Sequence, residues 1–330
     1  MNTSLATHLH DILTHAIEFT PEQSALVLFD TEAPLTNLLV EGYRANLPPE
    51  SFQDIASITP DEILARFQSM KPGDLVVLVQ STNFRLNEFR LRIELFKLGL
   101  KTIEHVHLAR IAPSQFETYI ASLAYDPNYY RPRGNELKRR IDACSQIVVE
   151  CPGTKLVYDS AFEPAKLNIG DYTGMTNVGG TYPIGEVFSE PLDLTKINGE
   201  LRLFAFAGKD HLIQEHKPFT AIVTNGVLTA PDAPESFKEI LAMIEEDSPV
   251  IMREFGLGLN RALGKGRLVN DLTAFERMNG MHISLGEKHS IYKKPGLPRD
   301  KGRYHVDVFI DLERITIDNE MVYNQNDFTV

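Results

Sequence analysis

Cysteine is scarce in this sequence of 330 residues, which contains only Cys144 and Cys151. Two cysteines cannot build a disulfide framework, and they exclude a zinc site made mainly of thiolates. Low cysteine usage is typical of proteins in a reducing compartment. We therefore expect a cytoplasmic protein.

Long apolar runs and basic stripes are also missing. No run approaches the ~20 residues that span a bilayer, so we expect no membrane association. Residues 1–19 lack the basic head and apolar core of a signal peptide, and they are better interpreted as an amphipathic helix. The formal net charge is −12, and the sequence has no basic stripe. Nucleic acid is therefore not an expected partner.

Glycine-rich phosphate loops are absent from the first part of the chain, although its pattern is that of an α/β domain. Strand signals lie at residues 25–29, 74–80, 101–108 and 146–150, and helical signals at 60–70, 84–98 and 136–144. Strands separated by helices predict a three-layer domain with a parallel sheet over residues 1–150. Because neither G-x-G-x-x-G nor G-x-x-x-x-G-K-S/T follows these strands, a nucleotide site is not expected.

Residues 151–330 have a different character. Short strand-like runs dominate, glycine and proline punctuate them, and one clear helix is predicted over 234–246. This pattern predicts a second, β-rich α+β domain. The charged residues inside its strands make it the candidate metal-binding domain.

His305 and Asp307 are the most informative residues in that domain. They lie two positions apart in a segment with strand alternation, so they share one face. Burying an imidazole and a carboxylate without partners is costly. A mutual hydrogen bond, a nearby arginine or a metal ion could each compensate them.

Three other segments contain isolated polar residues in apolar surroundings. Glu186 is the single charge in a Gly/Pro-rich loop, Glu254 lies in the apolar run VIMREFGLGL, and His282 lies in the strand GMHISLG. Each alone fits a solvated or internally paired residue. Together with His305 and Asp307 they supply three carboxylates and two imidazoles, a set that suits one or two divalent ions such as zinc, cobalt or manganese.

The order of these motifs resembles the thermophilic-type aminopeptidase family, which includes aminopeptidases T and S. The matching segments are GTYPIGEVFSEP, REFGLGLN, GMHISLG and YHVD, over roughly residues 150–330. The resemblance implies that Glu186, Glu254, His282, His305 and Asp307 bind metal, with Glu254 as the bridging ligand. It also implies a homodimer that acts on short peptides or amino-acid amides.

The sequence departs from the family pattern around the proposed catalytic residues. The family has a tyrosine seven residues after the strand histidine, where this chain has His289, and its Gly-rich stretch before H-x-D is replaced by residues 293–299. Glu276 is the best match for the family's further glutamate. We expect Glu276, or Glu254 itself, to act as general base, and His289 to bind metal or stabilise an oxyanion.

Three functions are therefore compatible with the sequence. The first is a metal-dependent, aminopeptidase-like hydrolase that removes N-terminal residues from short peptides through a metal-activated water. The second is a relative that binds a peptide or small molecule without cleaving it. The third is a ring-cleaving dioxygenase with a single non-haem iron, because some such enzymes resemble this peptidase family. Retention of both Glu186 and Glu254 argues against the third.

Overall fold

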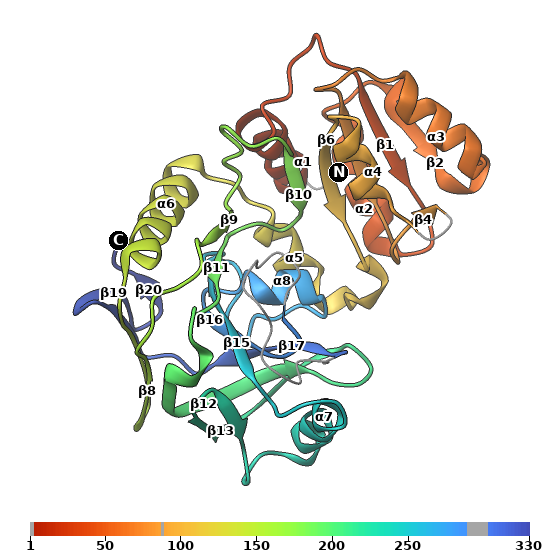
Figure 1. Cartoon of the computed structure of the whole chain (residues 1–330). Coiled ribbons are helices and arrows are strands. Elements are labelled where there is room, and N and C mark those ends of the chain that lie inside the picture. The colour runs from red at the N-terminus through yellow and green to blue at the C-terminus, as the bar shows by residue number, and fades with distance from the viewer. Residues whose placement is uncertain (1–2, 87–88, 289–302) are drawn as a thin grey trace. The chain divides into compact units, whose positions relative to one another are not determined.

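The computed structural model describes residues 3–86, 89–288 and 303–330. The chain forms two compact units (Figure 1), and each is built from separate segments. The first unit comprises Met1–Arg131, Gly170–Ile184 and Val269–Ala274, and the second comprises Pro132–Ile169, Gly185–Leu268 and Phe275–Val330. Over the described ranges, none of the helices is long and apolar enough to cross a membrane.

A parallel sheet lies at the centre of the first unit, with five strands in the order β10-β6-β3-β1-β2. The strands are β1 (Ala25–Phe29), β2 (Phe52–Asp54), β3 (Leu75–Val79), β6 (Lys101–His105) and β10 (Gly179–Thr181). The three central strands were predicted from apolar runs, and these predictions are confirmed. The edge strands β2 and β10 are only three residues long, too short for a sequence signal.

Helices pack against this sheet because its strands are apolar on both faces. Leu26 and Leu28 share a buried cluster with α3 (Pro60–Ser69) and α4 (Leu91–Lys97). The alternate residue Val27 is also fully buried, and α2 (Pro34–Arg44) contacts β1 and β3. The helices α1 (Thr3–Asp11) and α5 (Phe116–Ser122) pack against each other, and α1 also contacts α2. The predicted α/β class with a parallel sheet is therefore confirmed for this unit.

The predicted helix over residues 84–98 is wrong in extent. Only α4 is helical, and the short strands β4 (Arg85–Leu86) and β5 (Phe89–Arg90) precede it as an antiparallel pair. The backbone N–H of Phe84 donates to the side-chain oxygen of Gln80 at 2.7 Å, which fixes this residue directly after β3. The helix therefore starts later than the apolar spacing indicates.

The predicted fourth strand of the parallel sheet is wrong in its pairing. It forms as β7 (Ile147–Cys151) but pairs antiparallel with β8 (Thr154–Tyr158) and β18 (Arg314–Ile317) in the second unit. Two residues separate β7 from β8, and Gly153 between them has a φ of +77°. Such a short connection can join only antiparallel neighbours.

An antiparallel sheet of 13 strands forms the second unit. Its main path runs β20-β19-β18-β7-β8-β12-β17-β16-β15-β11-β9, while β13 pairs with β12 and β14. The remaining strands are β9 (Lys166–Asn168), β11 (Glu186–Ser189), β12 (Ile197–Ala207), β13 (Ile213–Thr224), β14 (Val227–Thr229), β15 (Met252–Gly258), β16 (Gly280–Gly286), β17 (His305–Ile310), β19 (Glu320–Asn324) and β20 (Asp327–Phe328).

Helices cover part of this sheet (Figure 1). The predicted helix over 234–246 forms as α7 (Glu235–Glu245). The Phe237 ring of α7 lies 4.9 Å from Phe206 on β12 and 5.1 Å from Phe219 on β13, measured between centroids. The longest helix, α6 (Pro127–Ala143), ends just before β7, and the short α8 (Leu272–Glu276) precedes β16. The predicted β-rich α+β class is therefore confirmed for this unit.

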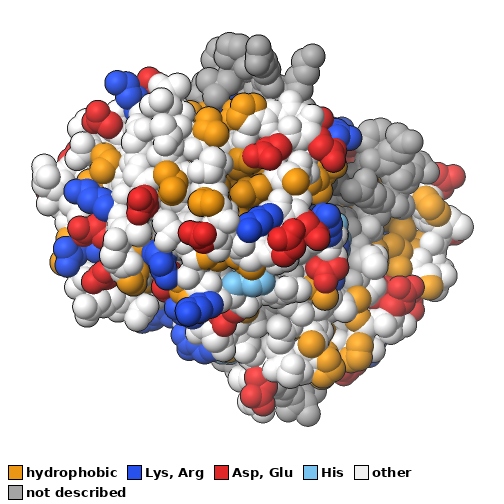
Figure 2. Space-filling model, turned by 90° about the horizontal axis from the view of Figure 1, so that it is seen from below, with side chains coloured by type: hydrophobic (Ala, Val, Ile, Leu, Met, Phe, Trp, Pro, Cys, Tyr) orange, Lys and Arg blue, Asp and Glu red, His pale blue; other side chains and the backbone are white. Residues whose placement is uncertain are grey.

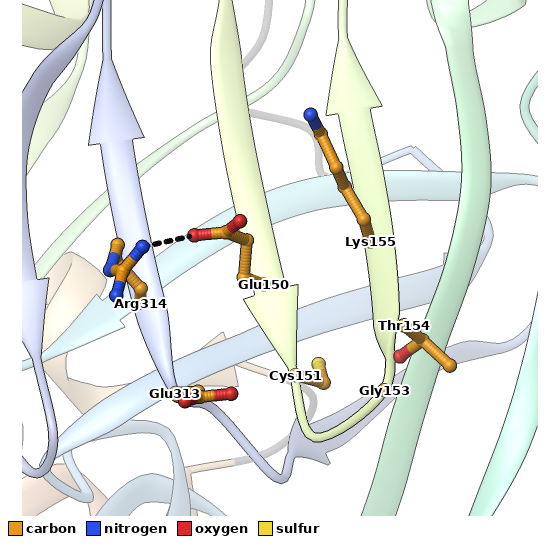
Figure 3. Close-up of a pocket in the computed structure, with 7 residues that line it drawn as sticks. All are labelled: Glu150, Cys151, Gly153, Thr154, Lys155, Glu313 and Arg314. Atoms are coloured by element: carbon orange, nitrogen blue, oxygen red, sulfur yellow. Dashed lines mark hydrogen bonds and ion pairs between the residues drawn. The ribbon is translucent and has the colours of Figure 1, made fainter.

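Acidic and basic side chains are interspersed over the left and central part of the face in Figure 2. A polar hollow of about 340 Å³ lies on the second unit around the β7–β8 turn (Figure 3). Its charged residues already include the ion pair between Arg314 and Glu150 at 3.1 Å. Cys151 also lines it, and burial raises the pKa of this thiol to about 11. The hollow contains none of the residues predicted to bind metal or to act in catalysis.

Candidate metal centre

Four neighbouring strands of the second sheet supply the five residues predicted to bind metal. The strands lie in the order β17-β16-β15-β11. Glu186 begins β11, Glu254 lies in β15, His282 lies in β16, and His305 and Asp307 lie in β17. Residues more than a hundred positions apart in the sequence are thus brought to adjacent strands.

Glycine on β15 makes room for the central imidazole. Gly256 lies directly opposite His282 in the β15–β16 ladder. A Cβ atom at residue 256 would overlap the imidazole ring of His282. The ring is fully buried and lies 6.1 Å from the Phe309 ring, measured between centroids. Gly256 is therefore needed in the REFGLGL segment because any larger residue would collide with the His282 ring.

The five side chains form two groups that share Glu254. One group is Glu186, Glu254 and His282, and the other is Glu254, His305 and Asp307; within each group the potential ligand atoms lie within 4.8 Å of one another. The Nε2 atom of His282 lies 3.5 Å from a Glu186 oxygen and 3.6 Å from a Glu254 oxygen. His305 Nε2 lies 3.4 Å from Asp307 Oδ1. Ligand atoms about 2.1 Å from a tetrahedral ion lie about 3.4 Å apart, so these spacings suit a metal.

Several buried polar atoms at this site make no hydrogen bond within the described part of the chain. They are both ring nitrogens of His282 and Oδ1 of Asp307, and for His282 Nε2 and Asp307 Oδ1 the charged contacts of 3.4–3.6 Å given above do not have hydrogen-bond geometry. An unsatisfied buried polar atom is destabilising, and native structures contain few of them. A divalent cation would directly engage one ring nitrogen of His282 and the free lone pairs of Asp307 Oδ1. The residues present therefore fit a metal ion.

Burial and neighbouring charges shift the pKa values of the carboxylates. Burial raises the pKa of Glu186 to about 6, although the charge of Arg277 opposes this shift. Burial likewise raises the pKa of Glu276 well above its usual range. Burial also disfavours ionised Asp307, but His305 outweighs it and lowers the pKa of Asp307 to about 2.

The pKa values of the two imidazoles are raised, although burial alone would lower them. Burial alone lowers the pKa of a histidine, but the neighbouring carboxylates raise the pKa of His282 to about 9. For His305 the largest opposing effect is the charge of Asp307, and the pKa rises to about 10. Without a metal, both rings are therefore protonated at neutral pH. A metal must displace these protons to bind.

Arg277 is a residue of this site that the sequence analysis missed. Its Nη1 atom lies 2.9 Å from Oε2 of Glu186 and also contacts Oε2 of Glu276. The predicted catalytic residue Glu276 ends α8, and its hydrogen bond to Asp307 lowers the pKa of that carboxyl. Glu276 therefore lies beside the two ligand groups. The only sequence signal for Arg277 was its position next to Glu276.

A buried ion pair supports the strand that presents Glu254. Arg253 Nη1 lies 3.1 Å from Glu190 Oε1, and Arg253 Nε donates to the carbonyl of Gly286 at 2.6 Å. Both charged side chains are almost fully buried. The N–H of Glu254 donates to Ser284 Oγ on β16 at 3.0 Å. The irregular β15–β16 register at this point leaves Glu254 out of the regular ladder.

His289, the third predicted catalytic residue, lies outside the described residues.

Comparisons with known proteins show similarity at the level of fold. No protein-family profile and no curated protein sequence matches the chain. Among solved structures, 2,5-dihydroxypyridine dioxygenase from Pseudomonas putida is similar with a TM-score of 0.68 at 15% identity, covering 100% of this chain and 98% of that chain. AmpT from Thermus thermophilus is similar with a TM-score of 0.62 at 14% identity, covering 99% of each chain. The chain therefore has the fold of these two proteins over its whole length.

Proposed function

We propose that this protein is a metal-dependent, aminopeptidase-like hydrolase that cleaves N-terminal residues from short peptides or amino-acid amides. The observation that carries this proposal is the shared position of Glu254. Each group around it contains one imidazole and two carboxylates, which suits two ions bridged by a carboxylate. The fold similarity to the aminopeptidase AmpT supports the same function. We also propose a homodimer and a cytoplasmic location.

The side chains of this centre have separate roles in the proposed reaction. Glu186, Glu254, His282, His305 and Asp307 would hold the metal. A bound divalent ion lowers the pKa of water and polarises a carbonyl group. Glu276 lies beside the centre and is the candidate general base, a role in which a carboxylate must accept a proton. Arg277 contacts the Glu276 carboxylate and so restrains its position.

A ring-cleaving dioxygenase is the second candidate. The fold similarity to 2,5-dihydroxypyridine dioxygenase supports it. So does the pairing of Arg277 with Glu186, because it engages one of the carboxylates that a two-ion centre needs. A single-iron oxygenase, however, uses two imidazoles and one carboxylate. Among the described residues, both groups around Glu254 have the opposite composition.

Purified protein loaded with Zn²⁺, Co²⁺, Mn²⁺ or Fe²⁺ distinguishes these functions. The hydrolase proposal predicts release of free amino acid from leucine amide or a tripeptide, lost in Glu254→Gln. The dioxygenase alternative predicts oxygen uptake with 2,5-dihydroxypyridine in the Fe²⁺-loaded protein alone. Peptide binding without turnover under every metal would support the non-catalytic alternative and overturn the hydrolase proposal.

A further inference from the structure

Arg277 places a permanent positive charge inside one of the two ligand groups. Its side chain is buried, with 8% of its surface exposed, and Nη1 lies 2.9 Å from Oε2 of Glu186. The same nitrogen contacts Glu276. An arginine remains charged at any pH that a folded protein experiences. A cation that binds through Glu186 must therefore share this carboxylate with a guanidinium.

The other group differs in this respect. Oδ1 of Asp307 forms an ion pair with Nε2 of His305 at 3.4 Å, and a neutral imidazole can itself bind a metal. Oδ1 of Asp307 makes no hydrogen bond within the described part of the chain. Within residues 3–86, 89–288 and 303–330, the ion pair of the Asp307 carboxylate is with this imidazole and not with an arginine or a lysine. The two groups share Glu254, so the contrast between Glu186 and Asp307 is the main difference between them.

We propose that Arg277 makes the two metal positions unequal. The group of Glu254, His305 and Asp307 takes a divalent cation first, and the group of Glu186, Glu254 and His282 is a weaker position that fills only at higher metal concentration. This inference rests on the metal centre of the proposed function and goes beyond it by ordering the two positions. The chain would therefore contain one tightly held ion and one exchangeable ion.

Two effects of Arg277 on the Glu186 group oppose each other. The guanidinium holds Glu186 in a fixed orientation, which favours binding by reducing the ordering needed. It also repels an incoming cation and withdraws charge from the ligand oxygen. In a buried site repulsion between neighbouring charges is strong, and it reduces affinity by on the order of tenfold or more. The repulsion therefore lowers the affinity of the Glu186 group for a cation by more than the fixed orientation of Glu186 raises it.

Calorimetric titration of metal-stripped protein with Zn²⁺ tests this ordering, and plasma emission of gel-filtered protein counts the ions retained. The natural chain should show two binding steps that differ at least tenfold in affinity, with one ion retained per chain. Arg277→Met should tighten the weaker step about tenfold and leave the tighter step unchanged. The matched variant Arg277→Lys keeps the charge and should behave like the natural chain.

Glu186→Gln provides a second test that leaves Arg277 in place. It should remove the weaker step and preserve the tighter one. Loss of the tighter step in Glu186→Gln, or two unchanged steps in a folded Arg277→Met protein, would overturn the inference. If Arg277→Met does not fold, the Glu186→Gln result decides alone. These titrations do not depend on turnover, so an inactive protein with two unequal steps would refute the proposed hydrolase function and leave the inference intact.

Discussion

Gly256→Ala is the most direct test of how the sheet forms the candidate site. The added Cβ would overlap the imidazole of His282, which lies opposite residue 256 and is fully buried. The φ of Gly256 is not positive, so alanine introduces a steric effect without backbone strain. Because the ring cannot move toward solvent, either His282 or strand β15 must shift.

The size of the effect follows from the packing. Overpacking a buried position costs about 1–3 kcal/mol, and each kcal/mol lowers the melting temperature of a unit of this size by about 2–4 °C. Displacement of the ligand His282 should also weaken Zn²⁺ binding to the Glu186 group by about tenfold or more, because changes to residues that orient a metal ligand have effects of this size. Thermal melting of metal-free protein and calorimetric titration measure the two effects separately.

Gly264→Ala is the matched control for this experiment. Gly264 belongs to the same unit, and a Cβ there would meet only the end of the Arg267 side chain at 3.4 Å. Its stability should change by less than about 0.5 kcal/mol, and its metal binding should be that of the natural chain. A Gly256→Ala protein with unchanged melting temperature and unchanged Zn²⁺ affinity would refute the steric role of Gly256.

Three further predictions concern neighbouring residues. Divalent metal should raise the melting temperature of the natural chain because it binds the folded state. Glu254→Ala should lose most of that rise. An equal rise in both proteins would show that the metal binds elsewhere. Arg253→Met should destabilise the protein by about 3–5 kcal/mol because it breaks a buried ion pair with Glu190. In chemical denaturation, Arg253→Met combined with Glu190→Leu should recover much of this loss. In metal-free protein, the pKa values of His282 and His305 are raised from 6.5 to about 9 and about 10. Their contribution to stability is complete below pH 6.5 and should be lost as the pH rises through 9 to 10; unfolding curves in which stability increases over this range would contradict the assignment.

Much of the fold could be predicted because the local signals and the tertiary structure agree. The buried run at 25–29 is a strand in the sequence and in the structure, and Thr59 and Glu62 form the expected capping box. The pairing of β7 could not be predicted from its composition. An apolar strand next to a helix fits a parallel sheet and an antiparallel sheet equally well. Only the tight turn at Gly153 shows that β7 pairs antiparallel.

The candidate site was predictable to a different extent for different residues. Glu186, Glu254, His282, His305 and Asp307 are isolated polar residues in apolar strands, so burial forces each of them to find a partner, and the structure brings them together. Arg277 gave no such signal, because an arginine beside a glutamate at a helix end is usually solvated. Its role depends on Glu186, which is ninety-one positions earlier in the sequence and becomes a neighbour only through the sheet.

The position of bound metal tests the central claim most directly. Crystals of the natural chain grown with Zn²⁺ should show an anomalous scattering peak at the zinc edge within about 2.0–2.2 Å of ligand atoms from Glu254, His305 and Asp307. At higher metal concentration a second peak should appear beside Glu186 and His282, about 3.5–4 Å from the first. A well-ordered second unit with no peak at Glu254, or with zinc bound only at other residues, would contradict the account.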